Sequence, residues 1–402
     1  MTRRALPVAV AATALTALAL TGCVAKSELA QAIAVEISDD ACAVATGTAP
    51  AGAVTFSLTN SGSDVNEFEI LAEDQLRIVG EKENVTPGQT VDFTAQLEPG
   101  TYYTACKFQQ VGAPVGLAEF TVTGEASAVS ADEQELSDQA VTEYLAYVRS
   151  QTSELLPLVQ QLADAYAAGD DEAARALFAT ARVPYERIEP TAEAFGDLDP
   201  KIDFREVDAV ADGLDWTGFH RIEKDLWAPK PGELNSDGQD ALKDWAPSTP
   251  EERKAYADGL VADVTQLQEL VTDSAFAVSL ADISNGAIAL LDEVAAGKIT
   301  GEEDWWSGTD LSDVAANVQG AGVAFGAVRA LAESKGDEGT ALADEIDGRF
   351  TALEDELAKY GSLDAGFVDY ATLTDADRKA LSDRVNALAE PLSQLTATVL
   401  GV

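Results

Sequence analysis

The spacing of apolar residues changes at Gly124, and this change constrains the fold more than any other feature of the sequence. From about residue 31 to residue 124, short apolar or alternating stretches, such as residues 33–37 and 53–58, are separated by turn sequences such as Thr86-Pro87-Gly88. Several short strands at this spacing are typical of a small β-sandwich or barrel. We therefore expect residues 31–124 to form an all-β sandwich.

Downstream of Gly124 the spacing becomes helical. Apolar residues recur at intervals of three and four, as in Leu260, Val264, Leu267 and Val271, and alanine is abundant. Long helices joined by short polar loops are expected to pack as antiparallel bundles. The sequence thus predicts a multidomain chain, in which a linker at residues 125–131 joins the all-β domain to an all-α helical bundle domain at residues 132–402.

The helical half is divided by its polar and proline-containing segments. Residues 196–216 are expected to be rich in loops, and Pro157 and Pro184 are expected to bend the helices that contain them. Capping boxes are indicated at Thr249 with Glu252 and at Thr374 with Asp377. The expected helices are residues 133–168, 170–188, 217–227, 250–272, 274–296, 310–335, 338–360 and 374–399.

Residues 1–22 have the pattern of a secretory signal peptide. Two arginines precede the apolar residues 5–20, a run too short for an ordinary transmembrane helix. The run leads into Leu20-Thr21-Gly22-Cys23, which resembles a bacterial lipobox. We expect residues 1–22 to be removed and Cys23 to be lipidated, which would anchor an extracytoplasmic protein to the outer face of the cell membrane, in the periplasm or at the cell surface.

The charge of the chain limits its partners. With 70 Asp and Glu against 26 Lys and Arg, the net charge is -44, so a polyanion would be repelled from most of the surface. We therefore expect no nucleic acid partner. The acidic excess suits a protein that handles cations, but it also suits a merely soluble extracytoplasmic protein. A separate alternative is a lipid-anchored adhesin or structural protein without metal. That alternative predicts no tight iron stoichiometry.

The only histidine, His220, marks the sharpest candidate site. His220 and Glu223 are three residues apart in an expected helix, so both can point at one cation. With carboxylates from facing helices, such a pair is how helical bundles build iron sites. Because imidazole is so scarce here, any metal site must depend on carboxylates, which favour hard cations such as ferric iron. The alternative is a hydrogen-bonded structural histidine.

Several acidic residues are further candidates. Glu186 and Glu189 share one helical face, and their mutual repulsion calls for a partner such as Arg182, Arg187 or a metal ion. The alternative is a solvated face with a surface ion pair. Additional acidic candidates are Asp203, Glu302, Glu303 and Asp304.

Together these segments resemble the imelysin-like domain of EfeO-type iron-uptake proteins. The resemblance rests on residues 182–190, 198–203, 218–223 (Gly-Phe-His-Arg-Ile-Glu), 299–304, 309–313 and 377–381. The N-terminal half resembles the cupredoxin-like domain of the same family, through Cys42 and residues 66–71, 81–85, 87–88 and 97–106. The resemblance covers nearly all of the mature chain.

This resemblance implies the iron-binding component of an EfeUOB-type uptake system. Its implied partners are a membrane iron permease of the Ftr type and a haem-containing dye-decolourising peroxidase. The family's metal site maps onto His220 and Glu223, with acidic partners at Glu186, Glu189, Asp203, and Glu302 or Glu303. Where some relatives carry Tyr-Ser-His-Thr-Asp-Leu, this chain has Trp306-Ser307-Gly308-Thr309-Asp310-Leu311, so one imidazole is missing.

The resemblance also implies a second site in the cupredoxin-like domain. The positions proposed there to bind copper or ferric iron are Cys42, Glu67, Glu81, Glu83 and Cys106, and zinc is a further candidate. A blue-copper centre is excluded, because it needs two His and a Cys and residues 24–124 contain no His. Two hypotheses remain for Cys42 and Cys106, a disulfide or a pair of thiolate ligands. We favour ligands, because Cys106 ends an expected strand where cupredoxin-like folds present a metal-binding cysteine.

Two enzyme hypotheses compete with simple iron binding. The imelysin-like family was once grouped with metallopeptidases, but a zinc peptidase typically uses two His and a carboxylate, and this chain has one His. A carboxylate-site oxidase that converts ferrous to ferric iron is compatible with the spacing. We expect iron capture and delivery, with no catalytic residues assigned.

Overall fold

The computed structural model describes residues 32–73, 75, 78–108, 114–125, 129–243 and 245–401. The expected signal peptide and Cys23 lie outside the described residues, as does part of the expected linker. Among the helices that the structure does describe, we find none with both the length and the apolarity that a membrane span requires.

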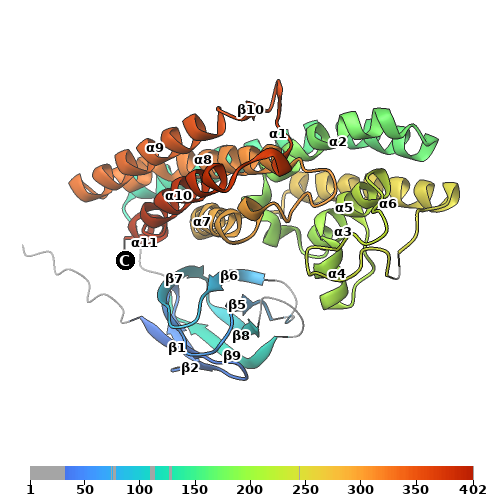
Figure 1. The fold of residues 1–402 in the computed structure, drawn as a ribbon. Coiled ribbons are helices and arrows are strands. Elements are labelled where there is room, and N and C mark those ends of the chain that lie inside the picture. The colour runs from blue at the N-terminus through green and yellow to red at the C-terminus, as the bar shows by residue number, and fades with distance from the viewer. Residues whose placement is uncertain are drawn as a thin grey trace, which may run out of the picture. The chain divides into compact units, whose positions relative to one another are not determined.

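The N-terminal part is built from two β-sheets (Figure 1). One sheet has the order β2-β1-β4-β7, formed by β2 (Cys42–Val44), β1 (Ile33–Ile37), β4 (Gly52–Asn60) and β7 (Thr90–Leu97). The other has the order β3-β9-β8-β5-β6, formed by β3 (Thr48–Pro50), β9 (Val115–Thr123), β8 (Gly100–Phe108), β5 (Asn66–Leu71) and β6 (Ile78–Val85).

Aromatic residues fill the space between these sheets. The ring centroid of Phe56 lies 5.2 Å from that of Phe68 and 5.4 Å from that of Phe120, and all three side chains are fully buried. Alternation along each strand places these rings inward. The prediction of a strand-rich N-terminal domain is confirmed.

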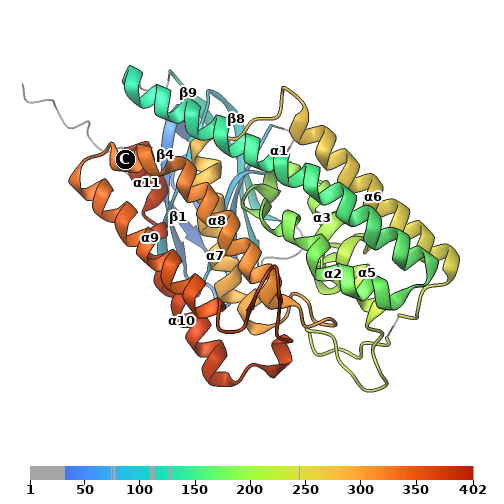
Figure 2. The same cartoon turned by 90° about the horizontal axis from the view of Figure 1, so that it is seen from above.

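The rest of the described chain is mainly helical. Its principal helices are α1 (Ala131–Ala168), α2 (Asp171–Glu186), α3 (Leu198–Asp203), α4 (Glu206–Asp212), α5 (Gly218–Leu226), α6 (Pro250–Thr272), α7 (Leu280–Ala296), α8 (Asp310–Glu333), α9 (Asp337–Leu357), α10 (Asp375–Leu392) and α11 (Leu395–Leu400). Three short 3₁₀ turns are η1 (Glu189–Phe195), η2 (Lys298–Thr300) and η3 (Tyr370–Thr372). Helix α1 packs along α2 and α6, and α8 packs between α7 and α9 (Figure 2).

The structure differs from the expected helices in four places. The expected loop at residues 196–216 contains α3 and α4, and a two-strand hairpin, β10 (Gly361–Ser362) with β11 (Gly366–Phe367), interrupts the helical half. The expected helix at 374–399 is divided into α10 and α11. Helix α7 begins at Leu280 rather than at residue 274, because Ser279 and Asp282 form a capping box there. The two capping boxes expected at Thr249 and Thr374 are confirmed.

Candidate metal centre

Helix α5, which carries His220 and Glu223, is buried along its whole length. It begins at Gly218, whose φ is +81°, and a Cβ at this position would lie 2.1 Å from the carbonyl oxygen of Ile202 in α3. Glycine therefore permits α5 to start against the end of α3. This close approach places His220 beside Asp203, the last residue of α3.

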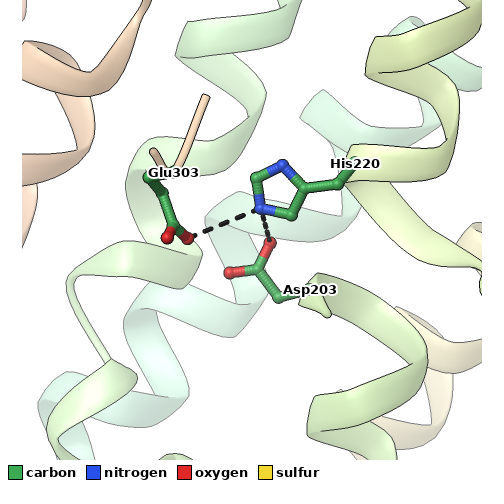
Figure 3. Close-up of side chains that lie close together, drawn as sticks. All are labelled: Asp203, His220 and Glu303. Carbon is green, nitrogen blue, oxygen red and sulfur yellow. Dashed lines mark ion pairs between the residues drawn. The ribbon is translucent and has the colours of Figure 1, made fainter. Parts of the chain in front are cut away.

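Two carboxylates, those of Asp203 and Glu303, approach one nitrogen of His220 (Figure 3). The Nε2 atom lies 3.6 Å from Asp203 Oδ1 and 3.5 Å from Glu303 Oε1, and all three side chains are buried. Nε2 makes no hydrogen bond among the described residues. Ligand atoms that each lie about 2.1 Å from one ion are roughly 3 to 3.5 Å apart, so the separations suit a shared cation.

Glu223 orients the imidazole from the opposite side. Its Oε2 lies 3.2 Å from His220 Nδ1, and its Oε1 accepts hydrogen bonds from the backbone N–H groups of Trp306 and Ser307. A carboxylate on one ring nitrogen fixes the ring and increases the basicity of the other. His220 Nδ1, Glu223 and Asp304 form a second group that could hold a metal ion. Glu223 thus shares a helical face with His220, but contacts the nitrogen that faces away from Asp203 and Glu303.

Arg182 lies at the centre of the surrounding carboxylates. Its guanidinium is fully buried and donates a hydrogen bond of 2.9 Å from Nε to Asp313 Oδ2. It also pairs with Glu186, Asp203, Glu303 and Asp304. These carboxylates raise the pKa of Arg182 well above its ordinary value, although burial alone lowers it. Arg182 therefore remains charged and holds the acidic groups together.

The pair Glu186 and Glu189 has one expected partner, Arg182, and one that was not expected, Lys298. Lys298 Nζ lies 2.6 Å from Glu189 Oε1 and 3.3 Å from Glu186 Oε2. The expected partner Arg182 does pair with Glu186, whereas Arg187 donates to Gln319. The two glutamates are buried or nearly so, which rules out the solvated-face alternative.

Of the two neighbouring candidates Glu302 and Glu303, only Glu303 lies at His220. Glu302 pairs with Arg205 at 3.1 Å, and 36% of its side chain is exposed. Asp304, Asp310 and Asp313 are buried acids of this region as well. Asp310 and Asp313 lie in the first turn of α8, where acidic residues are common for reasons of helix stability alone, so their positions gave no signal of a site.

The ionisation of this group is coupled to His220. Burial and Arg182 lower the pKa of His220, but the Glu223, Glu303 and Asp203 carboxylates outweigh them and raise it to about 10. Burial raises the pKa of Asp203 to about 7 against the opposing effect of Arg182. For Glu303, the positive charges of Lys298 and His220 outweigh burial, so its pKa is well below the ordinary value. An incoming metal ion would therefore displace a proton from the imidazole.

A small pocket reaches this group from the surface. Its volume is about 20 Å³, which is room for one water-sized ligand. Trp216, Trp305 and Trp306 line it, and it contacts His220 and Glu303. Such a pocket suits a single ion.

In the β-sandwich, the structure separates the five predicted ligands into two groups. Glu67, Glu81 and Glu83 lie together, each offering an oxygen within 4.8 Å of the others. Burial, followed by the charges of Glu81 and Glu83, raises the pKa of Glu67 well above its ordinary value. Cys42 and Cys106, in contrast, are joined in a disulfide within the apolar core.

The preference for thiolate ligands is therefore wrong for this form of the protein. Strand β5 pairs Phe68 with Cys106 and Glu67 with Lys107. Because side chains alternate between the faces of a sheet, Cys106 points into the sandwich core with Phe68, whereas Glu67 lies on the opposite face.

Two family models match the two halves of the chain. The Imelysin family model matches residues 140–395, and the Cupredoxin-like domain model matches residues 9–116. Iron uptake system component EfeO from Escherichia coli (strain K12) and that from Shigella flexneri are each 39% identical over 374 residues, which covers 92% of this chain and 92% of each relative. The crystal structure of an imelysin-like protein from Psychrobacter arcticum 273-4 aligns with 68% of this chain and 98% of that chain, with a TM-score of 0.46 and 12% identity.

Proposed function

Because the chain belongs to the EfeO family of iron uptake components, with a cupredoxin-like and an imelysin domain, we propose that it captures iron at the His220 site and delivers it to a membrane permease. One observation carries the proposal. The Nε2 atom of the only histidine is buried, makes no hydrogen bond within the described part of the chain, and is directed at Asp203 and Glu303.

The donor atoms suit iron. Imidazole nitrogen binds iron and other transition metals, and carboxylate oxygens favour hard cations. Glu223 supports the site by holding His220 through Nδ1, and Arg182 holds Asp203 and Glu303 near the imidazole. The cargo is iron in its ferrous or ferric form.

A peptidase function is not supported by this site. The chain has a single His, whose Nε2 faces two carboxylates. The site also lacks the common arrangement of two His and one carboxylate around an open zinc position.

The proposal extends to location and partners. A lipid anchor at Cys23 would hold the protein at the outer face of the cell membrane, next to a permease of the Ftr type and a haem-containing dye-decolourising peroxidase. The glutamates of the β-sandwich, Glu67, Glu81 and Glu83, would bind a further metal ion such as copper, zinc or iron.

Two neighbouring glutamates allow a matched test. Calorimetric titration with ferrous iron under anaerobic conditions should show affinity reduced at least tenfold, about 1.4 kcal/mol, in His220→Ala and in Glu303→Gln. Glu302→Gln is the matched control, because Glu302 pairs with Arg205 near the pocket. Its iron affinity should stay within about twofold of the wild-type value, about 0.4 kcal/mol. Far-UV circular dichroism checks that helical content is unchanged. Wild-type affinity in both His220→Ala and Glu303→Gln would refute the assignment.

A further inference from the structure

A second carboxylate pocket lies beside His220 and is filled by a lysine. Lys298 Nζ lies 2.6 Å from Glu189 Oε1, 3.3 Å from Glu186 Oε2, 3.7 Å from Glu293 Oε1 and 3.8 Å from Glu303 Oε1. The Lys298 side chain is 1% exposed. Four carboxylates therefore surround one buried cation that belongs to the chain itself.

The two cation positions share a carboxylate oxygen. Glu303 Oε1 lies 3.5 Å from His220 Nε2 and 3.8 Å from Lys298 Nζ. A carboxylate between two cation positions is how binuclear carboxylate sites in helical bundles hold two metal ions about 3.5–4 Å apart. The Lys298 ammonium thus stands where the second ion of such a pair would lie.

The pocket around Lys298 is a built structure. Asn317 Nδ2 donates hydrogen bonds to Glu186 Oε2 at 2.9 Å and to Glu189 Oε2 at 2.6 Å, which fixes both carboxylates toward the ammonium. Lys298 itself is held in η2, between α7 and the loop that carries Glu303. The fold therefore fixes the position of the ammonium, which is not the end of a flexible side chain at the surface.

We propose that the Lys298 ammonium occupies the second cation position of the bundle site and limits that site to one metal ion. This inference rests on the proposed function, in which His220 and Glu303 hold the first ion. It also distinguishes a carrier from an oxidase. Two-electron reduction of dioxygen to peroxide takes one electron from each of two ferrous ions and two protons, and a site limited to one ion lacks the second electron donor.

The test measures how many metal ions each chain binds and whether two of them are adjacent. Full-length Lys298→Met, which removes the charge and keeps the length of the side chain, should bind one more Mn²⁺ per chain than the wild type in equilibrium dialysis. Its electron paramagnetic resonance spectrum should gain the signal of an exchange-coupled Mn²⁺ pair, which the wild type should lack. Lys298→Arg, which keeps a cation in the pocket, should bind the wild-type number of ions.

Lys224→Met is the matched control. Lys224 is also fully buried, but among the described residues its ammonium pairs with one carboxylate, that of Glu206. It also donates a hydrogen bond of 3.1 Å to Asn235 Oδ1 and lies near three tryptophan rings. Its replacement should add no ion. If Lys298→Met is too unstable to purify, the double variant Lys298→Met with Glu189→Gln removes one negative charge together with the positive one and should still gain an ion.

The outcomes separate this inference from the proposed function. The role of Lys298 would be overturned if Lys298→Met and the double variant Lys298→Met with Glu189→Gln both bound the wild-type number of ions and showed no exchange-coupled Mn²⁺ pair. In that case, loss of one ion in His220→Ala would leave the proposed function intact. An ion count that His220→Ala leaves unchanged would instead overturn the proposed function.

Discussion

Replacing Arg182 by Met should destabilise the helical domain strongly at neutral pH. The guanidinium is fully buried and contacts Asp313, Asp203 and Glu186 at hydrogen-bonding distance. Removal of one partner from a buried ionic network costs about 3–5 kcal/mol, because the remaining charges stay buried without compensation. At about 2 °C per kcal/mol for a large domain, the melting temperature should fall by roughly 6–10 °C.

Arg329→Met is the matched control for this prediction. Arg329 also contacts three carboxylates, those of Glu333, Asp344 and Asp347, but its side chain is 35% exposed. Because water screens such a network, its loss should cost about 0–1 kcal/mol. Thermal unfolding followed by far-UV circular dichroism measures both variants.

The loss of stability in Arg182→Met should depend on pH in a defined direction. Arg182 lowers the pKa of Glu186, Asp203 and Asp313 relative to the values that burial alone would produce. Without it, these carboxyl groups take up protons more readily, and a neutral carboxyl group needs no cationic partner. The difference in stability from the wild type should therefore shrink as the pH falls: above about pH 7 through Asp203, whose pKa is about 7 with Arg182 present, and below it through Glu186, whose pKa Arg182 helps to keep below its ordinary value. Equal losses in Arg182→Met and Arg329→Met, or a loss below about 1 kcal/mol in Arg182→Met, would refute the reasoning.

Two further predictions concern His220 and the cysteines. The folded-state pKa of His220 is raised to about 10. The stabilisation by its charge is therefore full below the unfolded value of about 6.5 and is lost as the pH rises through about 10. Nuclear magnetic resonance of the only imidazole should show a protonated ring at about pH 8, and a neutral ring at pH 7 would contradict the raised pKa. Iron affinity should rise between about pH 6 and pH 8, because the imidazole proton becomes easier to displace. For the Cys42–Cys106 disulfide, thiol titration of denatured protein that begins after Cys23 should find fewer than one reactive thiol per chain, and reduction should destabilise the β-sandwich by about 2–4 kcal/mol. Two titratable thiols before any reductant is added would contradict the disulfide.

The sequence predicts the secondary structure around the candidate site better than the side-chain contacts within the site. Hydrophobic periodicity separates the strands from the helices, and the three-residue spacing of His220 and Glu223 places both on one face. Neither pattern shows which of 70 acidic residues are buried. Asp313 and Asp304 reach Arg182 only through the packing of α8 and its preceding loop against α2, which are far apart in sequence.

The same limit explains the error at the cysteines. The sequence positions of Cys42 and Cys106 are compatible with two thiolate ligands and with a disulfide, and the strand register decides between the two. The register of β5 against β8 places Cys106 beside Phe68 in the core, and this register depends on contacts between strands that local sequence does not specify. Lys298 was missed for a related reason. A lysine after a helix is usually solvated, and the local sequence does not show that Glu186 and Glu189 lie against it in the fold.

Anomalous diffraction at the iron absorption edge from iron-soaked crystals tests the central claim most directly. The account predicts an iron peak about 2.0–2.2 Å from His220 Nε2 and from oxygens of Asp203 and Glu303, with Lys298 still among its four carboxylates. Iron bound on the Nδ1 side of His220, or bound only at Glu67, Glu81 and Glu83, would contradict it.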